Sequence, residues 1–339
     1  MTASRTHRAF PRHLKRAALA LTYTAAVLAA AFTAMRILGI ETTWPLRLLV
    51  SYTPYAVLAA LVPPVAAFAL RRPRAALAAL IAPLALALLI APRAFADGGT
   101  DANGPRLTVA TVNLYYGHVD AAAVVALADE HDVDVLSVQE LTEEAAAALD
   151  LAGLAIRYPH RELSPGVDAS GTGVYSRFPL ARNASLEFPT HFKMTGVTLT
   201  VPGADPVELL ATHPLAPYEA ERVGDWLSDL ARLPRATPDG AVRILAGDFN
   251  ATLDHAALRE IVDSGYTDAA SATGAGLVGT WQPHPGDRAS VRGLVPPRVA
   301  LDHVLVDERV AVEAVAFDDV PGGDHRPVIA ELTLPAAAV

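Results

Sequence analysis

Residues 243–250 of the chain are RILAGDFN, and this stretch says more about the fold than any other. Its apolar first half is typical of a buried strand, and Asp248 and Asn250 follow at the point where that strand would end. Taken alone, an aspartate before Phe-Asn could simply cap a turn. The stretch gains its meaning from similar strand ends elsewhere in the chain.

From Arg106 onward, short apolar runs alternate with turn residues. Strands are expected over residues 107–114, 133–139, 173–176, 196–201, 207–212, 243–246, 303–306 and 328–334. Helices are expected over residues 121–130, 143–149, 218–233 and 255–264. Many strands with few helices between them predict a layered α/β or α+β sandwich rather than a doubly wound sheet.

Polar side chains stand at the ends of several of these expected strands. In addition to Asp248 and Asn250, they are Asn113, Glu140, His213, Asp302, Asp324 and His325. If the strands lie side by side, their ends converge on one pocket. Carboxylates and carboxamides suit a hard divalent cation such as Mg²⁺ or Mn²⁺, which also takes oxygen ligands from water and phosphate. The two histidines are then available for proton transfer or for stabilising charge.

Each of these residues also has a purely structural interpretation. Glu140 could begin the next helix, where an acid suits the helix dipole. His213 could simply end a strand, and Asp302 could pair with Arg298. The functional interpretation is favoured because the structural alternatives would all have to hold at once. His303, next to Asp302, is expected to be a packing residue.

Four motifs, in chain order, resemble those of the endonuclease/exonuclease/phosphatase superfamily, which includes DNase I-like nucleases, inositol-polyphosphate phosphatases and neutral sphingomyelinases. They are Val-Gln-Glu140, Gly-Asp248-Phe-Asn250, Asp302-His303 and Gly-Asp324-His325-Arg-Pro. The resemblance covers roughly residues 106–335. It implies a four-layer α/β/β/α sandwich and the hydrolysis of phosphoesters with a divalent metal ion.

The resemblance also implies where a metal and a substrate would bind. Glu140 corresponds to the principal Mg²⁺ or Mn²⁺ ligand, with Asn113 beside it and Asp324 near the metal or the leaving group. Some relatives carry an acid at the position of Tyr115, so the number of ions stays open. The stretch GTGVYSR, which ends at Arg177, resembles another stretch of the superfamily and makes Arg177 a candidate for substrate binding.

The remaining residues receive catalytic roles from the same resemblance. Asp248 would orient or deprotonate the attacking water, and Asn250 would hold the phosphate or that water. His325, oriented by Asp302, would contact the phosphoryl oxygens or act as a base. His213 would lie near the leaving group.

The charge of the chain is divided unevenly. The 339 residues carry a net charge of −9 and include no Cys. Residues 1–96 hold 11 Lys and Arg against one acid, a charge of +10, whereas residues 97–339 hold 16 against 35, a charge of −19. The lack of Cys excludes disulfides, Cys-zinc sites and a thiol nucleophile. The acidic part offers no broad basic surface for nucleic acid, so a nucleic-acid partner is disfavoured without being excluded.

The first hundred residues contain three apolar runs, at residues 17–35, 48–70 and 75–92. A helix of about 20 apolar residues crosses a membrane core of about 30 Å, so three membrane-spanning helices are expected. The alternative is a cleaved signal peptide followed by a soluble apolar domain, but no clear Ala-x-Ala site follows the first run.

Basic residues indicate the orientation of these spans. The tail before the first run and the link Arg71-Arg72-Pro73-Arg74 are basic and belong in the cytoplasm. Three crossings then place the C-terminal domain outside the plasma membrane. The expected organisation is a basic cytoplasmic tail (1–16), a three-helix anchor (17–95), a flexible linker (96–105) and a catalytic domain (106–339). The anchor resembles that of the VanJ-like membrane proteins of actinobacteria, which are linked with glycopeptide resistance.

Three functions are compatible with the sequence. The favoured one is a membrane-tethered phosphoester hydrolase whose substrate is a phosphorylated compound of the cell envelope, such as a polyprenyl- or phospholipid-linked phosphate. An extracellular nuclease would use the same catalytic residues, but the charge of −19 on residues 97–339 disfavours it. A scaffold that retains the fold without catalysis is least favoured, because the set of catalytic residues is complete.

Overall fold

A computed structural model of the protein describes residues 12–41, 43–97, 99–285 and 295–338. By its contacts the chain divides into two compact units. One unit contains residues up to Glu41 together with Tyr52–Ala91, and the other contains the segment that ends at Ser51 together with the chain from Pro92 onward. The segment that ends at Ser51, which includes the start of the second apolar run, therefore groups with the C-terminal domain, and the sequence did not indicate this.

The first unit is helical. Its helices are α1 (Arg12–Leu38), α3 (Thr53–Ala60), α4 (Val62–Ala69), α5 (Pro73–Ala79) and α6 (Ile81–Ile90). Large apolar side chains such as Leu28, Phe68 and Leu88 are 64%, 73% and 75% exposed, which suits a lipid environment rather than water.

Among the described residues, two helical stretches are long and apolar enough to cross a membrane, Arg12–Leu38 and Pro73–Ala94. A third crossing exists only if Trp44–Ser51 and Thr53–Ala69, which are bent by 80° to one another, count as one span. The structure thus supports two or three crossings, where the sequence predicts three.

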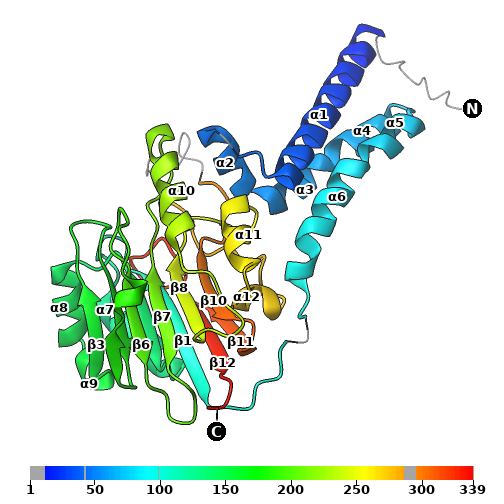
Figure 1. Cartoon of the computed structure of the whole chain (residues 1–339). Coiled ribbons are helices and arrows are strands. Elements are labelled where there is room, and N and C mark those ends of the chain that lie inside the picture. Colours follow the sequence, from blue (N-terminus) through cyan, green and yellow to red (C-terminus); the bar gives the residue numbers. More distant parts are fainter. Residues whose placement is uncertain (1–11, 42, 98, 286–294, 339) are drawn as a thin grey trace, which may run out of the picture. The chain divides into compact units, whose positions relative to one another are not determined.

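The second unit is built around two six-stranded mixed sheets (Figure 1). The first sheet has the order β11-β12-β1-β2-β4-β3 and the second the order β5-β6-β7-β8-β10-β9. The strands of the first sheet are β1 (Arg106–Asn113), β2 (Val135–Gln139), β3 (His160–Ser164), β4 (Thr172–Ser176), β11 (Ala311–Phe317) and β12 (Val328–Thr333). Those of the second are β5 (Leu180–Arg182), β6 (Thr195–Leu199), β7 (Val207–Thr212), β8 (Arg243–Asp248), β9 (Tyr266–Asp268) and β10 (Asp302–Asp307).

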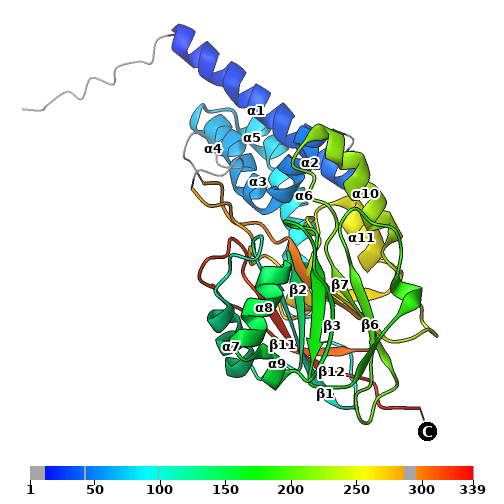
Figure 2. The ribbon, with the colours of Figure 1, turned by 90° about the vertical axis from the view of Figure 1, so that its left-hand side faces the viewer.

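Helices cover the outer faces of both sheets, and Figure 2 shows them on opposite sides of the strands. On the first sheet they are α7 (Ala121–Glu130), α8 (Glu143–Leu151) and α9 (Leu154–Arg157); on the second they are α10 (Val223–Arg232) and α11 (Ala256–Val262). The other helical segments of this unit are α2 (Trp44–Ser51), η1 (Ala91–Ala94), η2 (Ala184–Leu186), η3 (Ala220–Arg222) and α12 (Ala269–Ala272). η1 begins at the last residue of the first unit.

The main core lies between the two sheets. Leu107 and Val109 of β1 pack there in one apolar cluster with Leu209, Ile244 and Val304 of the second sheet, and all five are fully buried. Burying a side chain of this size contributes roughly 1.5–3 kcal/mol. Because helices cover the far faces as well, β2 and β4 are buried along their whole length. The expected α/β sandwich is therefore confirmed.

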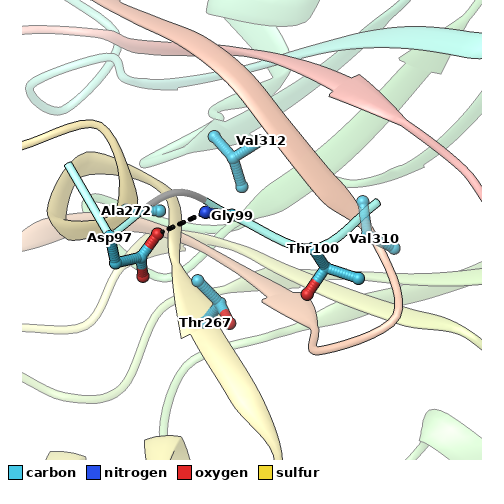
Figure 3. A pocket seen from close by; sticks show the side chains of 7 residues that line it. All are labelled: Asp97, Gly99, Thr100, Thr267, Ala272, Val310 and Val312. Atoms are coloured by element: carbon cyan, nitrogen blue, oxygen red, sulfur yellow. Dashed lines mark hydrogen bonds between the residues drawn. The ribbon is translucent and has the colours of Figure 1, made fainter. Parts of the chain in front are cut away.

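The residues expected to form the linker belong to the second unit and make backbone contacts with its other segments. Ala96 forms an isolated bridge with Thr273, and the Thr100 hydroxyl donates to the carbonyl of Glu308 at 2.8 Å. Further on, the Gly104 amide donates to the carbonyl of Leu334. The segment borders a hollow of about 200 Å³ lined by Asp97, Gly99, Thr100, Thr267, Ala272, Val310 and Val312 (Figure 3). None of these seven residues is one of the polar residues expected at the strand ends.

Candidate active site

Strand pairing brings the polar strand ends together. In the second sheet, β10 runs antiparallel to β8 so that Asp302 lies opposite Asp248. β7 runs parallel to β8 with Thr212 beside Gly247, which places His213 at the same edge. A Cβ on Gly247 would lie 1.9 Å from the carbonyl oxygen of Thr212, so only glycine fits directly before Asp248.

The first sheet supplies the other half of the cluster. β1 and β2 run parallel, and Asn113 lies beside Gln139, so that Glu140 follows at the same edge. The Asn113 side-chain amide donates to Glu140 Oε1 and to Asp248 Oδ2, both at 3.2 Å. One carboxamide thus joins the two sheets at the point where their strands end.

Four side chains, from the second sheet and from the loop before β12, form the centre of the cluster. His325 Nδ1 lies 2.8 Å from Asp302 Oδ2, and its Nε2 lies 3.7 Å from Asp248 Oδ2. His213 Nε2 lies at the same distance, 3.7 Å, from that Asp248 oxygen. Asp248 therefore sits between two imidazoles, and all four side chains are buried.

Unusual backbone geometry holds Glu140 in place. Glu140 itself has φ +56°, and Tyr115 and Tyr116 have φ +46° and +55°. In this conformation the Tyr116 amide donates to Glu140 Oε2 at 2.5 Å, and the Tyr115 amide donates to Asn113 Oδ1 at 2.9 Å. Non-glycine residues in this region of φ cost of order 1–3 kcal/mol each, and they persist where the surrounding structure fixes them, often at functional sites.

Two buried polar atoms of the cluster have no hydrogen-bond partner among the described residues: Asp324 Oδ1 and His213 Nδ1. The other oxygen of Asp324 accepts from the indole N–H of Trp281 at 2.9 Å, so the carboxylate is held with one oxygen unused. Leaving such an atom unsatisfied costs about 1–3 kcal/mol. The unused oxygen of Asp324 is therefore available to a cation, a water molecule or a substrate.

Burial and mutual repulsion shift the ionisation of these groups. Burial raises the pKa of Asp248 against the opposing charge of His325, and the Asp302 carboxylate raises it further. Burial alone would lower the pKa of His325, but the carboxylates of Asp302 and Asp248 outweigh it and raise that pKa. Burial and the neighbouring His325 lower the pKa of His213 to about 3, which keeps its ring neutral. Burial also raises the pKa of Glu140.

A divalent cation fits this arrangement. Four acidic side chains, Glu140, Asp248, Asp302 and Asp324, face one basic group, His325, whose raised pKa favours its protonated form. The surplus negative charge and the unused Asp324 oxygen suit a hard cation. Asp248, Asp302 and His325 each offer a ligand atom within 4.8 Å of the others. His325 Nδ1 and Asp302 Oδ2 are already engaged with one another at 2.8 Å, whereas Asp324 Oδ1 has no hydrogen-bond partner among the described residues.

Asn250 and Arg177 need separate comment. Asn250, at φ +48°, donates its side-chain amide to the carbonyl of Pro214, beside His213, and its backbone amide to Asp248 Oδ1. Asn250 therefore connects Asp248 to the loop that follows His213. In place of the expected substrate contact, the guanidinium of Arg177 pairs with Asp132 and with Asp134.

The reason is the register of the sheet. Ser176 lies opposite Val135, at the start of β2, whereas Glu140 follows the end of β2. The antiparallel pairing of β2 and β4 thus places Arg177 at the far edge from the site.

Two supporting residues carry little sequence signal. Trp281 forms backbone bridges with Val299 and His325, which place its indole against Asp324. The Thr280 hydroxyl accepts the backbone N–H groups of Leu301 and Asp302. No motif or strand pattern in the sequence assigns either residue to the site.

Comparison with known proteins gives one consistent result. A profile of the Endonuclease/Exonuclease/phosphatase family matches residues 110–325. An endonuclease/exonuclease/phosphatase from Beutenbergia cavernae is 20% identical with a TM-score of 0.52, covering 68% of this chain and 72% of that one. A truncated TDP2 from Caenorhabditis elegans is 19% identical with a TM-score of 0.51, covering 69% and 100%. No curated protein matches.

At these identities the solved structures show the fold alone. The family follows from the profile, which includes every residue of the cluster from Asn113 to His325. Members of this family are hydrolases that act on phosphoester bonds. The chain belongs to the endonuclease/exonuclease/phosphatase family.

Proposed function

We propose that the protein is a membrane-tethered hydrolase that cleaves phosphoesters outside the cytoplasm with Mg²⁺ or Mn²⁺. The single observation that carries this proposal is the buried position of Asp248 between two imidazoles, with Glu140 and Asn113 alongside. Clusters of ionisable groups in one desolvated place are typical of catalytic sites, and these groups suit the cleavage of a phosphoester.

A cation held by Glu140, Asn113 and Asp324 would neutralise phosphate charge. Asp248 accepts the Asn250 amide on one oxygen and faces the imidazoles with the other, so it is oriented to hold a water molecule. Its raised pKa makes it a better proton acceptor than an exposed aspartate.

The two histidines have different tasks. His325 is fixed through Nδ1 by Asp302, and its raised pKa keeps a proton on Nε2, where it can stabilise phosphoryl oxygens. His213 stays neutral because burial lowers its pKa to about 3, and it is suited to hydrogen bonding on the leaving-group side.

The placement of α2 supports the proposed topology. α2 follows α1 in the chain, yet it belongs to the same unit as the catalytic domain. If both lie on one side of the membrane, α1 crosses once and the chain from Tyr52 to Ala91 crosses an even number of times. The basic turn at Arg71, Arg72 and Arg74 then lies on the opposite side, in the cytoplasm.

A lipid-linked phosphate is the proposed substrate class, because a tether keeps the site close to the membrane surface and the acidic domain lacks a broad basic surface. The same features support the proposed kinship with VanJ-like membrane proteins.

The test is hydrolysis by the purified full chain in detergent with Mg²⁺. It is offered a polyprenyl pyrophosphate, a phospholipid panel and a plasmid, and phosphate release and nicking are measured. We expect release of phosphate from a lipid substrate, which disappears in Asp248→Asn and persists in the control Asp101→Asn. Nicking of the plasmid that is lost in Asp248→Asn would identify a nuclease, and no hydrolysis of any substrate would contradict the proposal.

A further inference from the structure

α2 carries a buried arginine that contacts the layer of helices over the second sheet. Arg47 is 6% exposed, and its guanidinium carbon lies 5.0 Å from the centroid of the Trp226 ring on α10 (Figure 2 shows α2 near α10). Arginine is rarely buried unless its charge is compensated, and the face of an indole is the strongest aromatic partner for a cation. The packing of Arg47 on Trp226 is therefore a specific contact between α2 and α10.

Trp226 connects this contact to the active site. The ring is fully buried, and its N–H donates to the carbonyl oxygen of Phe249 at 3.4 Å. Phe249 lies between Asp248 and Asn250, and its own ring is fully buried too. Only one side chain, Trp226, therefore separates Arg47 from the backbone that carries the proposed general base.

A second contact of Arg47 reaches the continuation of the same loop. His255 Nδ1 accepts the backbone N–H of Thr252 at 2.9 Å, so its proton is on Nε2, which donates to the Arg47 carbonyl oxygen at 3.1 Å. Burial lowers the pKa of His255 to about 4, which keeps this tautomer neutral. The His255 ring also meets the Trp226 ring edge-on at 5.3 Å.

Another arginine holds the loop from a different part of the chain. Arg93 lies in η1, directly after the last apolar helix, and pairs with both carboxylate oxygens of Asp254 at 3.0 Å. It also donates to the carbonyl oxygen of Leu253 at 2.9 Å. Asp254 is 1% exposed, so this bidentate pair is shielded from water and competing ions.

We infer that Arg47 and Arg93 are positioning residues that hold the catalytic loop from Asp248 to His255 in its active geometry. Both arginines belong to the same unit as the catalytic loop, although in the chain they lie more than 150 residues before it. The inference rests on the proposed hydrolase function. Misplacing a reacting group by about 1 Å can cost as much as 100-fold in rate, so the support of this loop has a measurable effect.

The test uses the full chain in detergent and the lipid substrate that it hydrolyses. In Arg47→Ala and Arg93→Ala we expect kcat to fall about tenfold with KM changed less than about twofold, because the loop carries Asp248 and not the proposed metal ligands. Arg47→Lys should recover most of kcat, because a cation remains over the indole. Arg232→Ala on the exposed face of α10 is the matched control and should leave kcat unchanged.

Trp226→Phe removes the indole N–H and keeps a ring in the core, so it tests the loop contact if Arg47→Ala folds poorly. Its kcat should also fall. Unchanged kcat in the folded arginine variants and in Trp226→Phe would overturn the inference.

Hydrogen–deuterium exchange separates this inference from the proposed function, because it needs no substrate. Peptides that cover residues 249–255 should exchange faster in Arg47→Ala and Arg93→Ala than in the wild type, while peptides of β1 should not change. If the wild type hydrolyses no phosphoester, the proposed function fails, and faster exchange would still show that the arginines hold the loop. Unchanged exchange in both variants would overturn the inference in that case as well.

Discussion

Two buried histidine–aspartate pairs lie next to one another in the domain, and they differ in what surrounds Nε2 of the histidine. His325 Nδ1 is 2.8 Å from Asp302, and His303 Nδ1 is 2.9 Å from Asp268. Asp302 and His303 are neighbours on β10, so their side chains lie on opposite faces of the sheet.

The second ring nitrogen distinguishes the two pairs. His303 Nε2 donates to the carbonyl oxygen of Ala251 at 3.0 Å, so both of its nitrogens are used. His325 Nε2 instead faces Asp248 at 3.7 Å, longer than a hydrogen bond. Because His303 Nε2 is hydrogen-bonded within the protein, the His303–Asp268 pair stabilises the fold. Because His325 Nε2 has no such hydrogen bond, the His325–Asp302 pair can act on a substrate.

Removing the imidazole of the catalytic pair should have the largest effect. In His325→Ala, kcat should fall about 100- to 1,000-fold, the range typical for losing a donor that stabilises charge in the transition state. The melting temperature should fall less than in His303→Ala, because a site that admits substrate also admits water to replace the ring. Phosphate release and thermal unfolding measure the two effects. A kcat within tenfold of the wild type would refute the assigned role of His325.

His303→Ala should show the opposite pattern. It leaves the buried Asp268 without its partner and the Ala251 carbonyl without a donor, at a cost of about 3–5 kcal/mol in the free energy of unfolding. Chemical denaturation measures this cost. Because His303 also holds Ala251 of the catalytic loop, kcat of the remaining folded enzyme should fall by about tenfold at most, far less than in His325→Ala. If kcat fell as far as in His325→Ala while stability was unchanged, the comparison between the pairs would be wrong.

The pH dependence of stability should reveal the structural pair. The pKa of Asp268 is lowered and that of His303 raised: burial opposes both shifts, but the mutual hydrogen bond outweighs it. The contribution of the aspartate is complete above its unfolded pKa of 3.8 and is lost as the pH falls through the folded value. That of the histidine is complete below its unfolded pKa of 6.5 and is lost as the pH rises through the folded value.

The stabilisation by this pair should therefore be greatest between pH 3.8 and 6.5. Denaturation curves across this range should show a maximum in the difference between wild type and His303→Ala. A difference that does not vary with pH would contradict the linkage.

The smallest effect is expected at Arg177. Because its guanidinium pairs with Asp132 and Asp134 at the far edge of the first sheet, Arg177→Ala should leave kcat and KM within about twofold. Steady-state kinetics decides this. A large rise in KM would restore the substrate role that the sequence suggested.

The sequence alone predicted the site residues that stand at the ends of central strands. Asn113, Asp248 and Asp302 each stand at the end or start of a buried apolar run, and the pairing of these runs brings them together. The expected sandwich follows from the same runs, because strands buried on both faces require a layer on each side.

Edge strands were harder to predict because only part of their surface is buried. β3 (HRELS) is polar and half-exposed, and β5 has only three residues, so neither shows a clear apolar pattern. β11 carries an irregularity between Val312 and Ala314 that shifts its register. Such strands are defined by their neighbours rather than by their own composition.

The support of the site also depends on tertiary contacts. Left-handed backbone at Tyr115 and Tyr116 is unfavourable locally and is set by the site around it, so no local pattern predicts it. The contact between Arg47 and Trp226 joins residues 179 positions apart, and the apolar run at residues 48–70 predicts one span where the chain bends by 80°.

The central claim is that the strand ends of both sheets meet at one cation site, and diffraction from crystals soaked in Mn²⁺ tests it most directly. We expect an anomalous peak within about 2.2 Å of a Glu140 carboxylate oxygen, with Asn113 and Asp324 beside it. The peak should weaken or vanish in Glu140→Gln and persist in His303→Ala. A Mn²⁺ ion bound only elsewhere on the domain, with none in contact with Glu140, would contradict the account.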